Sequence, residues 1–122
     1  MEAASDPQTH LPLTPAVFHI LLALSEGERH GYGIMQEVAA LTDGALRLGP
    51  GTLYGTLKRL LIAGLVEEAE ERTDQAQGDE RRRYYRLTEL GDKVIRAEAR
   101  RLESLIGAAR RMRLLSPHGG AQ

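Results

Sequence analysis

The chain has 122 residues, of which 42% are hydrophobic and 27% are charged, so it holds one small domain. It contains no cysteine, which excludes disulfides and thiolate metal sites and fits a reducing compartment. The formal net charge is −1, so a nucleic-acid partner would have to be recognised through a local patch of cations and not through overall charge.

The N-terminal part predicts a flexible segment followed by a core helix. Residues 1–13 show no apolar periodicity and contain two prolines, and we expect a flexible tail there. A helix begins at Pro15, since Thr14 can cap its amides and a proline in the first turn loses no hydrogen bond. It is apolar nearly all round until Ser25, yet too short for the roughly 20 residues that cross a bilayer, so we expect a cytoplasmic protein with no membrane partner.

A second helix is predicted over residues 30–44, because apolar side chains recur there at helical spacing. Gly44 is suited to ending it. We place Tyr32, near its start, in the core and not at a ligand site.

The stretch GPGTLYGTLKRLLIAGLV, residues 49–66, predicts a third helix with two different faces. Pro50 suits its first turn, and Gly64 suits the left-handed residue that often ends a helix. At about 100° per residue the leucines share one face, made of Leu53, Leu57, Leu60 and Leu61. The opposite face carries small and cationic residues together with one exposed aliphatic, namely Gly51, Gly55, Lys58, Arg59 and Ile62.

No acidic residue lies between Gly44 and Val66, although the chain holds 17 acidic residues against 16 basic ones. A mid-helix glycine costs about 1 kcal/mol relative to alanine, so glycines on a solvent face serve something other than stability. They leave a low surface through which a helix can lie close to a bulky ligand such as a DNA groove. The alternative is that Gly51 and Gly55 occupy loop or tolerated positions because the helix begins later.

Two short strands are predicted next, over residues 65–72 and 81–88, joined by a polar loop. Alternation places Tyr85 and Leu87 on a core face. The other face of the second strand is cationic and carries Arg82, Tyr84 and Arg86.

A long last helix is expected from Glu89 to about Leu115, capped by Thr88 and followed by a disordered tail over residues 116–122. From Leu102 onward its apolar residues follow a three-and-four spacing that resembles a coiled-coil seam. A projecting helix with an apolar stripe needs a partner, and we expect a second copy of the chain. The expected dimerisation residues are Leu102, Leu105, Ile106, Ala109 and Met112.

Three helices followed by a two-stranded hairpin predict a mainly α fold with a small β-hairpin (α+β). We expect a winged helix-turn-helix domain over residues 14–88 and a dimerisation helix over residues 89–115. The segments LTPAVFHILLAL, HGYGIMQEV, GPGTLYGTLKRLLIAGLV and RRRYYRLTELG resemble, in order and spacing, the N-terminal domain of PadR-type transcriptional regulators. The resemblance covers about residues 11–100. The single C-terminal helix is similar to the short subfamily, whose members dimerise through that helix and mostly repress transcription.

The resemblance implies a sequence-specific, homodimeric repressor that binds a pseudo-palindromic operator in double-stranded DNA and is released by a small-molecule effector. The third helix corresponds to the recognition helix of the family. On it, the positions that match DNA contacts are Thr52, Tyr54, Lys58 and Arg59. On the wing, which is the hairpin after that helix, the matching positions are Arg81, Arg82, Arg83 and Arg86.

Other interpretations of these residues remain open. The arginines at 81–83 can serve only as cross-strand partners of the acids at 67–71, and Tyr54 can pack at the edge of the core. The whole domain can act as a protein–protein interaction module through Ile62 and the long helix, without binding DNA. We expect no enzyme, no metal and no cofactor, because the chain lacks nucleophile and phosphate-loop motifs and its 4 histidines show no metal-ligand spacing.

Overall fold

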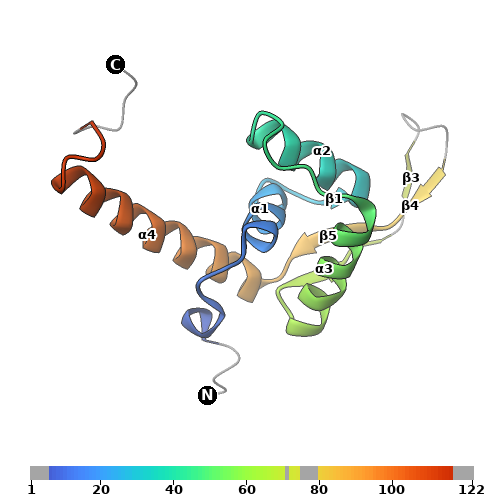
Figure 1. Cartoon of the computed structure of the whole chain (residues 1–122). Coiled ribbons are helices and arrows are strands. Elements are labelled where there is room, and N and C mark those ends of the chain that lie inside the picture. Colours follow the sequence, from blue (N-terminus) through green and yellow to red (C-terminus); the bar gives the residue numbers. More distant parts are fainter. Residues whose placement is uncertain (1–5, 71, 75–79, 117–122) are drawn as a thin grey trace.

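The computed structural model describes residues 6–70, 72–74 and 80–116 (Figure 1). Its helices are the 3₁₀-helix η2 (Pro7–His10) and the α-helices α1 (Pro15–Leu24), α2 (Gly31–Leu41), α3 (Pro50–Ala63) and α4 (Glu89–Arg111). Strands β1 (Arg29–His30), β5 (Tyr84–Leu87) and β2 (Val66–Glu68) form an antiparallel sheet in that order, and β3 (Arg72–Asp74) pairs with β4 (Glu80–Arg82) beyond it. The β3–β4 ladder and the free end of α4 lie at opposite ends of the molecule (Figure 1).

The helices begin where local chemistry predicts. The Thr14 hydroxyl accepts a hydrogen bond from the Val17 amide at 3.3 Å, and the Thr88 hydroxyl accepts one from the Gly91 amide at 3.0 Å. α3 begins at Pro50 and ends at Gly64, whose φ of 79° is left-handed. These starts and this end are confirmed.

Aliphatic side chains from all four α-helices form the core. Its fully buried members include Ile20, Leu21, Ile34, Val38, Leu53, Leu57 and Val94. Tyr85 of β5 is the one aromatic side chain in this set of buried residues, so the sheet contributes a single large ring to a core built of Leu, Ile and Val.

The N-terminal segment departs from the expected flexible tail. Residues 7–10 form η2, which packs against α4, and Leu11 and Leu13 pack against the core. The Leu13 amide donates a hydrogen bond of 2.9 Å to the carboxylate of Glu98, a residue of α4 that is only 2% exposed. The segment lacks helical periodicity because it is held by one short turn and by isolated contacts; residues 1–5 lie outside the described part.

The predicted hairpin is divided into two ladders whose registers differ by one residue. Glu68 pairs with Tyr85 in the first ladder, whereas Arg72 pairs with Arg82 in the second, so the first strand carries one extra residue between them. Such a bulge interrupts the regular alternation on the strand that carries the extra residue, which is the one predicted over residues 65–72. β1, a strand of two residues that pairs with β5, is not predicted from the sequence.

α4 ends at Arg111, four residues before the predicted end. The Leu114 amide bonds back to the Ala109 carbonyl at 2.9 Å, and Arg113 takes a left-handed φ of 65°, which stops the helix. Residues 117–122, expected to be disordered, lie outside the described part. None of the helices within the described ranges combines the length and hydropathy that a membrane span requires.

Candidate nucleic-acid interface

One face of α3 is buried and the other is open to solvent. Leu53, Leu57 and Leu60 pack in the core, whereas Thr52, Lys58 and Arg59 are exposed. The helix already begins at Pro50, so Gly51 and Gly55 lie inside it and the interpretation of a later start is wrong.

Neither glycine is required by the packing of the chain itself. A Cβ added at Gly51 would meet no atom within 4 Å, and one added at Gly55 would meet only the Arg59 guanidinium, at 4.0 Å. The low surface that these glycines leave therefore faces outward, toward whatever approaches α3.

The cations beside this surface lack carboxylate partners among the described residues. No ion pair there involves Arg47, Lys58 or Arg59, and the Arg59 guanidinium donates only to the Thr56 hydroxyl at 3.2 Å. α3 has no acidic residue in its first turn, and its N-cap, Gly49, has no side chain to cap the first amides. Free amides and the partial positive charge of a helix start favour anions, so this end of α3 attracts negative charge.

Tyr54 is exposed, as a DNA contact requires, and it also packs against another helix. Its side chain is 47% exposed on the solvent face of α3, yet its ring leans against the start of α2. A Cβ added at Gly31 would overlap the Tyr54 hydroxyl and ring. The HGYGI and PGTLY motifs therefore meet in space, and Gly31 sets where the Tyr54 ring lies.

The expected core position of Tyr32 is wrong, since this side chain is 42% exposed. α2 turns Ile34 and Val38 into the core, and a residue two positions before Ile34 points about 200° away from it on a helix.

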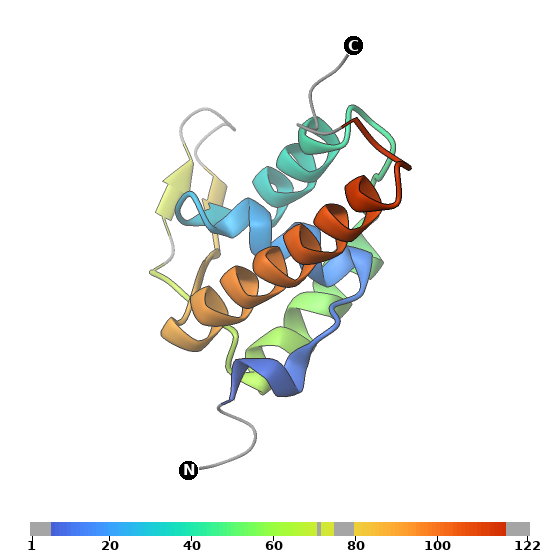
Figure 2. The same ribbon diagram turned by 90° about the vertical axis from the view of Figure 1, so that its left-hand side faces the viewer.

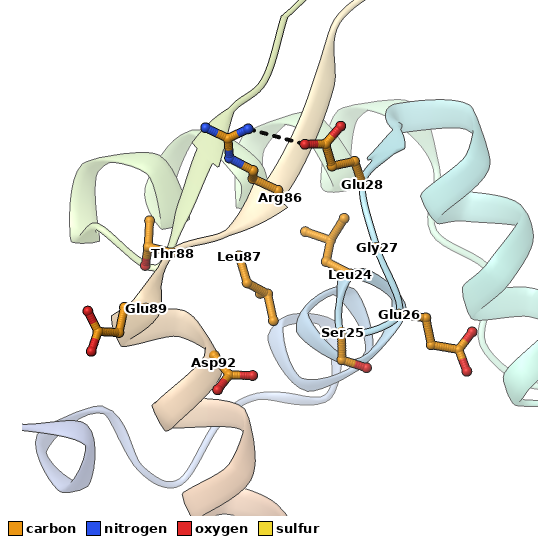
Figure 3. A pocket seen from close by; sticks show the side chains of 10 residues that line it. All are labelled: Leu24, Ser25, Glu26, Gly27, Glu28, Arg86, Leu87, Thr88, Glu89 and Asp92. Carbon is orange, nitrogen blue, oxygen red and sulfur yellow. Dashed lines mark hydrogen bonds and ion pairs between the residues drawn. The ribbon is translucent and has the colours of Figure 1, made fainter.

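Two of the wing arginines, Arg83 and Arg86, are paired with acids, unlike the cations of α3. Arg86 Nε lies 2.8 Å from Glu67 Oε2 and its Nη1 lies 3.1 Å from Glu28 Oε2, the contact drawn in Figure 3. Arg83 Nε lies 3.6 Å from Glu68. Cross-strand pairing with acids, the alternative interpretation of residues 81–83, thus holds for Arg83 and applies also to Arg86.

Arg82 is partly buried, and the side chain of Arg81 lies outside the described part. The hollow in Figure 3, beside Arg86, is lined by more acids than bases, with Glu26, Glu28, Glu89 and Asp92 around it. Phosphates are repelled from that side, so among the described residues of the interface the cations without carboxylate partners lie on α3 and in the turn before it, at Arg47, Lys58 and Arg59.

The residues expected to mediate dimerisation form an apolar stripe on the projecting half of α4. Leu105 is 54% exposed, Ile106 42% and Met112 73%, while Leu102 and Ala109 are partly buried. Leu114 and Leu115, just past the helix, extend this surface, and Figure 2 shows α4 lying across the outside of the molecule. The stripe lies on a different element from the α3 surface.

The end of α3 and the start of α4 are joined directly. The Thr88 hydroxyl, besides capping α4, donates to the Gly64 carbonyl at 2.6 Å. A Cβ at Gly91 would overlap the Leu65 carbonyl, so α4 begins in backbone contact with the segment after α3. The start of α4 is thus held directly against the end of α3.

Three packed helices, the third exposed and followed by a hairpin, define a winged helix-turn-helix protein. The sequence model described as "Transcriptional regulator PadR-like family" matches residues 20–97, and the chain belongs to this family of transcriptional regulators.

Relatives and solved structures agree with this assignment. The transcriptional regulator Rv3488 of Mycobacterium tuberculosis is 38% identical over 87 residues, which are 71% of this chain and 75% of that protein. An uncharacterized 37.1 kDa protein of the Streptomyces fradiae transposon TN4556 is 36% identical over 88 residues, 72% of this chain, but the match spans only 23% of that longer protein.

Solved structures of other regulators share the fold. A PadR family transcription regulator from Clostridium difficile R20291 superposes with a TM-score of 0.67 at 22% identity, covering 81% of this chain and 98% of that one. Bacillus subtilis PadR in complex with operator DNA superposes with a TM-score of 0.59 at 21% identity, covering 70% of this chain and 47% of that one.

Proposed function

We propose that this transcriptional regulator is a homodimeric repressor that binds a pseudo-palindromic operator in double-stranded DNA through α3 and is released by a small-molecule effector. The observation that carries the proposal is the outer face of α3, where Lys58 and Arg59 lack carboxylate partners among the described residues and flank two glycines that no internal contact requires. The operator complex of Bacillus subtilis PadR, a protein of the same fold, supports it.

α3 is the reader in this proposal. Its first turn, with Thr52 and Tyr54, enters the major groove, and the glycines let its backbone lie close to the base edges. Lys58 and Arg59 contact phosphates, which supply affinity but no sequence choice. Of the wing arginines, Arg83 and Arg86 contribute less, because each must first leave a carboxylate.

The apolar stripe of α4 supplies the dimer. Large exposed apolar surfaces on small proteins mark interaction sites, and a second α4 offers a matching stripe. A two-fold dimer then presents two α3 helices to half-sites about 34 Å apart.

The contact between α3 and α4 supplies the route for an effector. A ligand that changes how the two α4 helices cross alters the spacing of the α3 helices, because Thr88 and Gly91 join these elements. The dimer represses transcription when it occupies a promoter. Repression ends when the ligand-bound spacing no longer fits the operator.

The test is fluorescence anisotropy with labelled DNA from upstream of the protein's own gene, scrambled competitor DNA and a salt series. We expect selective binding that falls steeply with salt, and its loss in Lys58→Ala/Arg59→Ala. The matched control is Arg96→Ala, which removes an exposed cation of α4 that is already paired with Asp92 at 2.9 Å. A folded dimer that ignores DNA sequence and salt contradicts the proposal.

A second candidate function is favoured by Ile62, which is 79% exposed on α3. Together with the α4 stripe, this side chain fits a protein–protein interaction module that binds no DNA. Its affinity for its partner would depend little on salt, since few charges are neutralised.

A further inference from the structure

An open hollow lies between α2 and the turn that leads into α3. Its walls are Tyr32, Met35, Gln36 and Ala39 from one face of α2, and Arg47 and Leu48 from the turn. The polar groups in these walls are a phenol, an amide and a guanidinium, and no carboxylate lines it. We call this set of residues the α2 hollow.

The α2 hollow lies next to the DNA-facing side of α3. Leu48 precedes the N-cap of α3 by one residue, and Tyr32 follows Gly31, the residue against which the exposed Tyr54 leans. A helix in the major groove has a sugar–phosphate backbone on each side of it. The hollow therefore lies where one of those backbones passes if α3 enters the groove.

Arg47 is held at the rim of this hollow by the shape of the turn. Its guanidinium lies 3.1 Å from the position that a Cβ on Gly44 would occupy, and Gly44 has a left-handed φ of 82°. Arg47 is exposed, and within the described ranges no carboxylate pairs with it. Its charge is thus available to a ligand, although its place near the end of α2 also suits the negative pole of that helix.

We propose that Tyr32, Gln36 and Arg47 form a phosphate-binding site that positions α3 on DNA, an addition to the reader residues that rests on the proposed function. The guanidinium supplies the charge, and the phenol and amide supply neutral hydrogen bonds to the same backbone. These residues are positioning residues, because phosphate contacts fix register and add affinity without distinguishing bases.

The test measures anisotropy for operator and scrambled DNA over a salt series. Arg47→Ala should weaken binding to both DNAs by the same factor, about tenfold, and lower the log–log salt slope by about 0.9 per protomer. Tyr32→Phe should weaken both about threefold and leave the slope unchanged, because it removes a neutral hydrogen bond. Arg96→Ala should match the wild type in both measurements.

The outcomes separate the two proposals. If Lys58→Ala/Arg59→Ala abolishes selective binding while Arg47→Ala keeps the wild-type affinity and slope, the phosphate site is overturned and the proposed function stands. A lower melting temperature of Arg47→Ala without any change in slope assigns this arginine to the end of α2 and also overturns the site. If the wild-type dimer shows no salt-dependent DNA binding, both proposals fail.

Discussion

The hydroxyl of Tyr54 on α3 lies so close to Gly31, the first residue of α2, that no Cβ fits between them. This contact joins the two most distinctive motifs of the sequence and determines the position of an exposed ring on the proposed DNA-binding face. Tyr54 is 47% exposed, so its ring can turn outward if Gly31 is enlarged.

Gly31→Ala should therefore cost about 1–2 kcal/mol of unfolding free energy, because the added methyl group displaces the ring. The cost should shrink to a few tenths of a kcal/mol when Tyr54 is already alanine. A double-mutant cycle by urea unfolding measures this coupling. Equal costs in both backgrounds would show that Gly31 is needed for some reason other than Tyr54.

Gly55→Ala should change stability and DNA affinity in opposite directions. Alanine fits this helical position without a clash and should raise the unfolding free energy by about 0.5–1 kcal/mol, since glycine is the poorer helix former. The same methyl group stands between α3 and the groove, so operator affinity should fall. A variant that is more stable and binds DNA as tightly as the wild type would refute a close-approach role for this glycine.

Glu98 should make stability depend on pH. Hydrogen bonds from Arg101, 2.6 Å away, and from the Leu13 amide hold the pKa of this carboxyl below its ordinary value of 4.5 against the opposing effect of burial. A lowered folded-state pKa adds stability above the unfolded-state value, and this stability is lost as the pH falls through the folded-state value.

Glu98→Gln should accordingly lose about 1–3 kcal/mol at pH 7, where the buried carboxylate has its full effect. The difference from the wild type should narrow as the pH falls below about 4.5 and through the lowered pKa of the folded state. Urea unfolding at several pH values measures this difference. A gap that stays constant across that range would mean that the charge of Glu98 does not matter to folding.

Removing an acidic side chain from the wing should raise the affinity of the protein for DNA. Glu67→Gln takes away the carboxylate 2.8 Å from Arg86 Nε and frees part of that guanidinium for phosphate. DNA affinity should rise a few-fold, while stability should change by less than about 1 kcal/mol because the pair is exposed. Anisotropy and thermal unfolding test both parts, and Arg86→Ala should not share the gain in affinity.

Leu105→Glu/Ile106→Glu should convert the proposed dimer into a folded monomer. Leu105 is 54% and Ile106 42% exposed in the single chain, so charges there cost nothing in the core but oppose the packing of two α4 helices. Sedimentation velocity measures the mass and circular dichroism the fold. A double variant that still sediments as a dimer would place the interface elsewhere.

Short-range chemistry made much of this fold predictable. Thr14, Pro50 and Thr88 mark helix starts because capping and proline geometry act within a few residues. The period of the leucines determines which side of α3 is buried, and the absence of acids around Lys58 and Arg59 is visible in the linear sequence.

Contacts between distant residues were decided only by the tertiary structure. Leu13 and Glu98 are 85 residues apart, and Glu28 and Arg86 are 58 apart, so no local pattern links either pair. From the sequence alone, residues 7–13 are therefore predicted to belong to a tail, Arg86 is predicted to contact DNA, and Tyr32 is predicted to lie in the core. Local preferences act along a few residues of chain, whereas which charges are neutralised and which cations stay free depends on the side chains that packing brings together.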